Sequence, residues 1–255
     1  MAHLELDNIT VRFGGLVALS QLSFSINSGE IVGLIGPNGA GKTTVFNVLT
    51  GVYKASSGNV RFEGESILGK PPHEIFSQGV ARTFQNIRLF SAMTAVENAM
   101  VARHCRSKIG VVGAIFRTGS QRREEQFIHD KALEALKFMG VDKYADTVAS
   151  NLPYGLQRRL EIARALASQP KVILLDEPAA GMNPSESSAL MKDISRICEL
   201  GIDVLLVEHD MKVVMGVCHR IVCVDHGVKI AEGTPEEIQS SPQVIEAYLG
   251  QPASK

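Results

Sequence analysis

The first candidate for chemistry is a glycine-rich segment at residues 36–44. It fits the spacing G-x-x-x-x-G-K-[ST] in full and consists of Gly36, Pro37, Asn38, Gly39, Ala40, Gly41, Lys42 and Thr43, with Thr44 next. Glycines allow a backbone to wrap closely around phosphate groups, so that successive N–H groups face the anion. Lys42 would reach the β- and γ-phosphates, and the Thr43 hydroxyl would bind Mg²⁺. The segment therefore predicts a nucleoside triphosphate site.

A second candidate is a pair of acids, Asp176 and Glu177, which directly follows the apolar run at 172–175. An acid at the end of a parallel strand lies at the carboxyl edge of its sheet, where ligands bind. We expect Asp176 to coordinate Mg²⁺ and Glu177 to take a proton from an attacking water. The alternative is a solvated start of a loop, and the apolar residues that lead into the acids argue against it.

A third candidate is His209, which comes just after the apolar run at 204–207. A single histidine is usually a surface residue or one whose hydrogen bonds are satisfied within the fold. Here the position at the end of a predicted core strand indicates a contact with the γ-phosphate. The other histidines have no predicted role.

These residues need a sheet to position them, and the hydropathy pattern supplies one. Residues 4–13 and 19–26 alternate between apolar and polar, as half-buried antiparallel strands do. Short apolar runs at 31–35, 172–175 and 204–207 are typical of buried parallel strands, and helical patterns follow them at 41–50, 184–200 and 210–217. The predicted fold is α/β, a P-loop NTPase core with a parallel sheet and an antiparallel β layer at the N-terminus.

The middle of the chain has a different pattern. Helical periods at 94–103 and 123–139 flank a glycine-containing stretch at 104–122, which we expect to be a loop. We therefore predict a single domain over 1–255. In it, an α/β core at 1–85 and 166–255 carries an inserted helical subdomain at 86–165.

Composition narrows the class of protein. The chain has 255 residues, is 45% hydrophobic and has a net charge of −1, which fits a packed globular protein and lowers the expectation of a nucleic-acid partner. The cysteines do not form a C-x-x-C pair, so we expect unpaired thiols in a reducing compartment. The N-terminus does not have the pattern of a signal peptide, and no apolar run approaches the ~18 residues of a membrane span. If the protein works at a membrane, another subunit spans it.

Taken together, these motifs resemble the ATP-binding subunit of ABC transporters over essentially the whole chain. The resemblance implies that Phe13, in VRFGG, stacks on adenine. It implies that Gln85, in ARTFQNIRLF, contacts Mg²⁺ and water and that its loop touches the membrane subunits. His209 matches the switch histidine, the segment 152–157 matches the signature, and Asn183 falls where the family usually has aspartate.

Five segments narrow the resemblance further: ARTFQNIRLF, NLPYGLQRRLEIARAL, DEPAAGMNP, VEHDMKVVMG and VIEAYLG. Together they are similar to the longer of the two ATPase subunits of high-affinity branched-chain amino-acid importers. The implied ligands are ATP and Mg²⁺. The implied partners are a sister ATPase subunit or a second copy of the chain, two membrane permease subunits and, indirectly, a periplasmic amino-acid-binding protein, with no nucleic acid. The implied location is the cytoplasmic face of the inner membrane, as a peripheral subunit.

The signature departs from the family pattern. In the family, each ATP lies between the phosphate loop of one subunit and the signature helix of the other, and Gly155 fits the position where the backbone closely approaches that ATP. Pro153 stands in place of the serine, Tyr154 in place of the first glycine, and Leu156 in place of the glutamine. We interpret the segment as a weakened signature. The site that it completes against the partner's phosphate loop would hydrolyse ATP more slowly than the site that holds this chain's own Lys42 and Glu177. The alternative is a purely structural helix.

Three other functions remain as alternatives. A soluble ABC-type ATPase acting on DNA or the ribosome would share the nucleotide motifs, but the near-zero charge and the expected exposure of Ile87, Leu89 and Phe90 beside Gln85 favour docking to another protein. An importer subunit for amides or urea is a second alternative, because related subunits serve those substrates. A P-loop kinase for a small molecule leaves the segment 151–166 unexplained. Which amino acid is transported is not encoded here, because the binding protein and permease select it.

Overall fold

The computed structural model describes residues 2–105 and 119–249 and contains two compact units. One unit consists of Met1–Ile75 together with Lys171–Lys255, and the other of Phe76–Pro170. The predicted subdomain at 86–165 falls within the range of the second unit. Most of the predicted loop at 104–122 lies outside the described residues.

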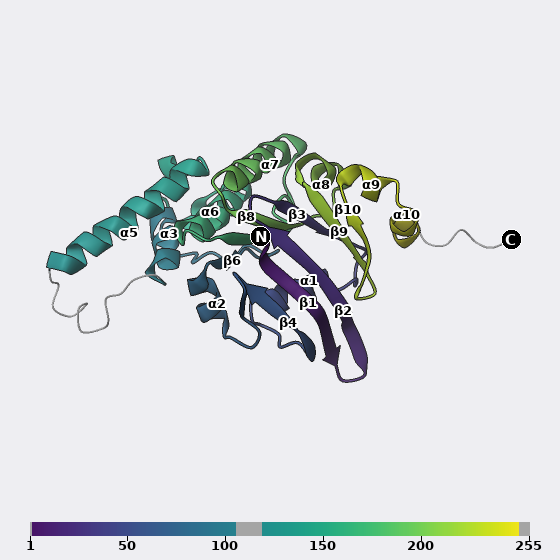
Figure 1. Cartoon of the computed structure of the whole chain (residues 1–255). Helices are drawn as coiled ribbons and strands as arrows, with labels where there is room; N and C mark the ends of the chain where they lie inside the picture. Colours follow the sequence, from purple (N-terminus) through teal and green to yellow (C-terminus); the bar gives the residue numbers. More distant parts are fainter. Residues whose placement is uncertain (1, 106–118, 250–255) are drawn as a thin grey trace. The chain divides into compact units, whose positions relative to one another are not determined.

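The first unit contains an antiparallel sheet, as predicted. Its strands are β1 (Ala2–Phe13), β2 (Leu16–Asn27), β4 (Ser57–Phe62) and β5 (Glu65–Ser66), in the order β2-β1-β4-β5. The long pair β1 and β2, drawn in purple in Figure 1, runs side by side. Alternate residues of β1, such as Leu4 and Leu6, are buried, because successive side chains of a strand point to opposite faces.

A second sheet of this unit carries the predicted core strands. It contains β3 (Ile31–Ile35), β7 (Val172–Asp176), β8 (Asp203–Val207), β9 (Arg220–Asp225) and β10 (Val228–Gly233), in the order β10-β9-β3-β8-β7. Every residue of β3, β7 and β8 is buried. The pairs among β9, β3, β8 and β7 are parallel, as predicted, and at one edge β10 pairs with β9 in the antiparallel direction. Their hairpin needs only a short turn, whereas a parallel pair needs a long crossover.

The helices of the first unit include three that follow the predicted core strands, α1 (Lys42–Leu49), α7 (Pro184–Glu199) and α8 (Met211–Val217). They also include α9 (Pro235–Gln239) and α10 (Pro242–Leu249), which follow β10. Asn183 caps α7: its side chain accepts a hydrogen bond from Glu186 N, and the Glu186 side chain accepts one from Asn183 N. Asparagine and aspartate are equally good N-caps, so the departure from the family pattern at this position preserves the cap.

The second unit is mainly helical. It contains β6 (Val80–Arg82), α3 (Ala95–His104), α5 (Gly119–Phe138), α6 (Tyr154–Ala167) and two short 3₁₀ helices, η1 (Asp142–Tyr144) and η2 (Ala149–Asn151). Helix α2 (Pro72–Gln78) lies where the chain passes from the first unit to the second. Helices α3, α5 and α6 pack against one another.

The ends of α3 and α5 differ from the sequence prediction. The loop expected at 104–122 is wrong at both described ends: His104 ends α3, and residues 119–122 form the first turn of α5. The stretch QRREEQ that begins at 121 consists of good helix formers, so the helix extends one turn before the expected start. Across the described part of the chain, no helix combines the length and the hydropathy needed to cross a bilayer.

Candidate functional site

The order of the strands brings the three predicted motifs together. Strand β8 lies between β3 and β7 and is parallel to both, so the loops that follow these strands leave the sheet at the same edge. The loop after β3 is the glycine-rich segment, the one after β7 begins with Glu177, and the one after β8 contains His209. In an open parallel sheet this carboxyl edge is where ligands bind.

The glycine-rich loop depends on backbone shapes that only glycine adopts freely. Gly36 has a φ of 153°, and a Cβ placed on it would lie 2.0 Å from the carbonyl oxygen of Val224 in β9. Gly41 has a φ of 107° and is the N-cap of α1, where no side chain caps the helix. The first N–H groups of α1, around Thr43 and Thr44, therefore face the loop without a competing side-chain acceptor at the cap, as an anion site requires.

Lys42 is folded over this loop and is 8% exposed. Its Nζ donates to the carbonyl oxygens of Gly36, at 2.7 Å, and of Pro37, at 2.9 Å. Burial lowers the pKa of Lys42, whereas the negative charges of Glu177 and Asp176 act in the opposite direction. The ammonium group is thus held within the electrostatic reach of both predicted acids.

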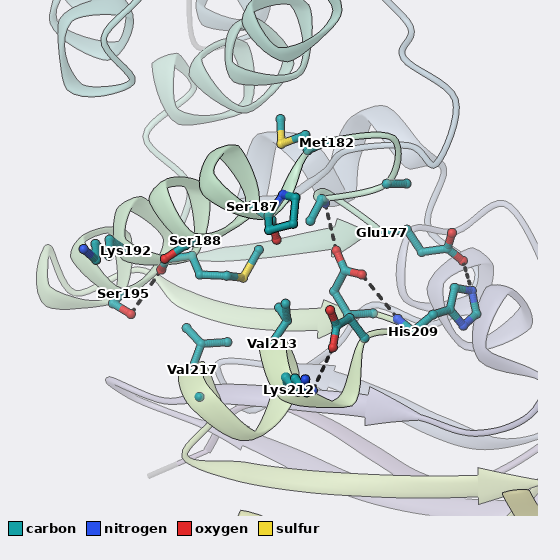
Figure 2. A pocket seen from close by; sticks show the side chains of 17 residues that line it. Glu177, Met182, Ser187, Ser188, Lys192, Ser195, His209, Lys212, Val213 and Val217 are labelled. Carbon is teal, nitrogen blue, oxygen red and sulfur yellow. Dashed lines mark hydrogen bonds and ion pairs between the residues drawn. The ribbon is translucent and has the colours of Figure 1, made fainter.

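Glu177 and His209 form a direct contact that the sequence did not reveal. Figure 2 shows their side chains pointing toward each other, with His209 Nε2 2.5 Å from Glu177 Oε1. Glu177 has a φ of 47°, a costly backbone shape for a glutamate, and its N–H donates to Val207 O at 2.9 Å. The Glu177 side chain is 13% exposed and that of His209 is 50% exposed, so the pair lies at the surface of the edge.

A neighbouring acid, Glu208, was missed by the sequence reading. It is 6% exposed; one carboxylate oxygen accepts from Ala179 N at 2.8 Å and the other from His209 N at 3.2 Å. Burial raises the pKa of Glu208. Its carboxylate ties the loop after β7 to the loop after β8. The only signal in the sequence was an acid immediately before the predicted histidine.

A cavity of about 620 Å³ lies between α7 and α8 and opens beside the Glu177–His209 pair. Figure 2 shows hydroxyl and thioether side chains on its walls, including Ser187, Ser188 and Met182. The pair is therefore accessible from outside the sheet, as residues that meet an external ligand must be.

At the end of β1, Phe13 is 45% exposed. Its ring meets that of Tyr53 at a centroid separation of 5.1 Å and an interplanar angle of 73°, an edge-to-face arrangement. Such packing fixes the orientation of the ring and leaves Phe13 partly open to solvent. The sequence reading named Phe13 and did not find Tyr53.

Two predicted site residues, Gln85 and Gly155, belong to the second unit. Gln85 is exposed, and so is Phe90, whereas Ile87 and Leu89 are only half-buried and not fully exposed as expected. Gly155 is half-buried in the first turn of α6, whose N-cap is Pro153. The structure thus groups the loop 36–44, Asp176, Glu177 and His209 within the first unit.

The metal ligands predicted in the first unit, Thr43 and Asp176, both offer oxygen atoms. Asp176 ends β7 and is 6% exposed, and Thr43 is exposed in the first turn of α1. Within the described ranges, no cluster of three or more His, Cys, Asp or Glu side chains is arranged to hold a metal. Mg²⁺ needs only a few oxygen ligands from the protein, because it usually keeps several waters and binds one or two carboxylates plus substrate phosphates. The residues fit an ion that enters with a nucleotide.

The ABC transporter family model matches residues 19–180, and a model for the branched-chain amino acid ATP-binding cassette transporter matches 228–254. The high-affinity branched-chain amino acid transport ATP-binding proteins BraF of Pseudomonas aeruginosa and LivG of Salmonella typhimurium are 46% and 47% identical over 97% of this chain and 98% of their own. The crystal structure of the ADP conformation of MJ1267, an ATP-binding cassette of an ABC transporter, is similar with a TM-score of 0.85 and 34% identity, covering 98% of this chain and 100% of that one.

Proposed function

This chain belongs to the ABC transporter family, and we propose that it hydrolyses ATP to power the import of branched-chain amino acids. Within the family it belongs to the ATP-binding proteins of the branched-chain amino acid type. One observation supports the site most strongly. The loops after the adjacent strands β3, β8 and β7 leave the sheet at one edge. At this edge Lys42 is bound to the glycine-rich loop, and Glu177 contacts His209.

The residues have separate roles in this proposal. The loop 36–44 holds the phosphates of ATP, and Lys42 offsets the charge that develops on the β- and γ-phosphates. Glu177 accepts the proton of the attacking water, and its contact with His209 orients the carboxylate. Once the γ-phosphate is present, His209 is also placed to contact it.

Four further residues are assigned on the family resemblance, and for Thr43, Asp176 and Phe13 their place in the first unit supports the assignment. Mg²⁺ would be held by the Thr43 hydroxyl and the Asp176 carboxylate, with Gln85 as a third contact. The ion supplies neutralisation of the developing phosphate charge. Phe13 stacks on adenine, and its exposed ring at the end of β1 supports that role.

Partners are also proposed. Two ATPase subunits, either this chain with a sister subunit or two copies, would enclose ATP between a phosphate loop and the N-terminus of a partner's α6, where Gly155 lies. The exposed segment around Gln85 and Phe90 would dock on two permease subunits at the cytoplasmic face of the membrane, with a periplasmic amino-acid-binding protein on the other side. The altered signature at Pro153, Tyr154 and Leu156 would make the composite site it completes the slower one. Disabling each site of the assembled complex in turn tests this, and equal losses contradict it.

The experiment that tests the proposed function is Glu177→Gln in the reconstituted importer. We expect ATP binding to be retained and turnover to fall by ~10²–10⁴-fold, the usual contribution of a positioned base. Glu199→Gln, at the exposed end of α7, is the matched control and should behave as wild type. Turnover near wild type in Glu177→Gln would remove Glu177 from the mechanism.

The substrate class needs a separate test. ATPase activity should rise when the permease is joined by a binding protein loaded with leucine, isoleucine or valine, and should not rise with amide- or urea-loaded proteins. Stimulation by DNA or ribosomes in place of the permease would favour the soluble alternative.

A further inference from the structure

A buried ion pair in the second unit contains none of the residues proposed to bind or hydrolyse ATP. Arg158 and Glu161, one turn apart on α6, are both fully buried, and Arg158 Nη1 lies 2.9 Å from Glu161 Oε2. Burial raises the pKa of Glu161, against the lowering effect of the Arg158 charge. A charged pair removed from water is costly, and apolar side chains of similar size often serve stability equally well. Its presence therefore calls for a role that apolar side chains cannot fill.

The pair binds the backbone of a segment more than 70 positions earlier in the chain. Arg158 Nη1 donates to Phe84 O at 2.7 Å, and Nη2 donates to Gln85 O at 2.7 Å. The second carboxylate oxygen of Glu161 accepts from Arg88 N at 3.2 Å and, at a longer 3.4 Å, from Phe84 N. Backbone groups before, at and after Gln85 in the chain are thus bound by two side chains of α6.

Neighbouring contacts extend this connection. Arg164, also on α6, donates from Nη1 to Arg88 O at 2.5 Å. Asn98, on α3, accepts from Phe90 N at 2.9 Å and donates to Phe90 O at 3.1 Å. The segment 84–90 therefore has its path set by polar side chains of α6 and α3.

A third side chain, Tyr154 in the first turn of α6, contacts the Arg158 member of the pair. Its hydroxyl lies 3.3 Å from Arg158 Nη2, and the guanidinium carbon is 5.9 Å from the centre of the ring. Residues at i and i+4 share a helix face, so Tyr154 covers Arg158 from the side of the helix N-terminus. The first turn of α6 and the Gln85 segment are consequently connected through one guanidinium group.

We propose that Arg158 and Glu161 are positioning residues that fix the backbone around Gln85 to the N-terminal half of α6. The inference rests on the proposed function, because only there do Gln85 and the first turn of α6 meet nucleotide. Any displacement of α6 then displaces the Gln85 backbone with it. Neither side chain needs to touch ATP for this effect.

The test uses the full chain with Arg158→Lys, which keeps the charge beside Glu161 but cannot reach both carbonyl groups with one fork of donors. Arg159→Lys is the matched control: it lies next on the same helix, and its guanidinium donates to Met139 O at 3.0 Å, away from Gln85. We expect backbone amide exchange of 84–88 to be faster by about tenfold in Arg158→Lys, the effect of losing one charge-assisted hydrogen bond, and unchanged in Arg159→Lys.

Kinetics then separate positioning from plain destabilisation. In Arg158→Lys we expect kcat for ATP hydrolysis to fall by about 10–100-fold, as a small misplacement of a reacting group produces, with KM for ATP unchanged. If that variant does not fold, Glu161→Gln replaces it, since its amide oxygen still accepts from the backbone while the charge beside Arg158 is lost. We expect the same split between kcat and KM, with a smaller loss.

Two results overturn the inference. One is exchange of 84–88 at the wild-type rate in the variants, and the other is faster exchange with wild-type kcat, which leaves the pair only structural. Failure of the proposed function is a distinct result, because the wild-type chain would then show no ATP turnover while the exchange measurement still reports on the connection.

Discussion

Replacement of Gly36 by alanine tests how strictly the phosphate loop is shaped by its surroundings. The new Cβ would lie 2.0 Å from Val224 O, far short of the 3.4 Å at which ordinary contact begins, and the partner is a backbone atom of β9 that cannot rotate away. Overpacking of this kind costs ~1–3 kcal/mol. A residue other than glycine at a φ of 153° costs a further ~1–3 kcal/mol.

The strain falls on the nucleotide site. Gly36 O is one of the two carbonyl groups that hold Lys42 Nζ, so a shift of Gly36 displaces Lys42 as well as the loop N–H groups. We expect affinity for ATP to fall by about tenfold or more, since each 1.4 kcal/mol of lost binding energy is tenfold in Kd. Urea unfolding gives the free energy of unfolding, and titration with a fluorescent ATP analogue gives the affinity.

Gly64→Ala provides the control. Gly64 has a φ of 82° and lies in the same unit, but a Cβ there meets nothing within 4 Å. It should lose only the ~1–2 kcal/mol of the backbone term and keep wild-type affinity. If Gly36→Ala loses no more stability than Gly64→Ala and binds ATP as the wild type does, the loop is not held by Val224 and the reasoning is wrong.

Further variants test the other parts of the site. Lys42→Ala should weaken ATP binding by about tenfold or more, because a hydrogen bond to a charged group is lost; unchanged affinity in the same titration would contradict the phosphate-loop assignment. Tyr53→Ala should weaken ATP binding by about two- to tenfold, the worth of an aromatic pair, whereas Tyr53→Phe keeps the ring against Phe13 and should bind normally. For Glu208, burial raises the pKa above its ordinary value of 4.5, so the folded state holds the proton more strongly and stability is lost as the pH rises through the folded pKa. Relative to Glu208→Gln, the wild type should therefore lose stability as the pH rises above 4.5, as urea unfolding at each pH would show, and a difference independent of pH would exclude the buried charge as its cause.

The features that the sequence predicted correctly are those that depend on neighbouring residues. The run IVGLI matches β3 residue for residue, because a fully buried strand requires an unbroken apolar run. Positive φ at Gly39 and Gly41 is likewise a local demand of backbone shape, whereas the contact of Gly36 with Val224 is not local. Since adjacent parallel strands end at one edge, predicting β3, β7 and β8 was sufficient to gather Lys42, Asp176, Glu177 and His209.

The features that were missed depend on partners distant in the chain. Glu208 acquires its role from the backbone of Ala179, 29 positions earlier, and Tyr53 from Phe13. Neither contact produces a recognisable hydrophobic period in the sequence around Glu208 or Tyr53. Strand β9 is a different case: its run IVCV at 221–224 is as apolar as those of β7 and β8, and the same rule would have found it.

The altered signature shows how a local departure and a distant contact combine. Read alone, Tyr154 in place of glycine suggests only a weaker site for a partner's phosphate. In the fold, its hydroxyl lies beside Arg158, which binds Phe84 O and Gln85 O from across 73 or 74 positions of the chain. Because Tyr154 and Arg158 are spaced by one helical turn, a tyrosine here supports the guanidinium in a way that glycine cannot. The change at Pro153, which removes the serine, and the change at Tyr154, which adds a contact to the guanidinium, are therefore separate, and only the second connects the first turn of α6 to the backbone of Gln85.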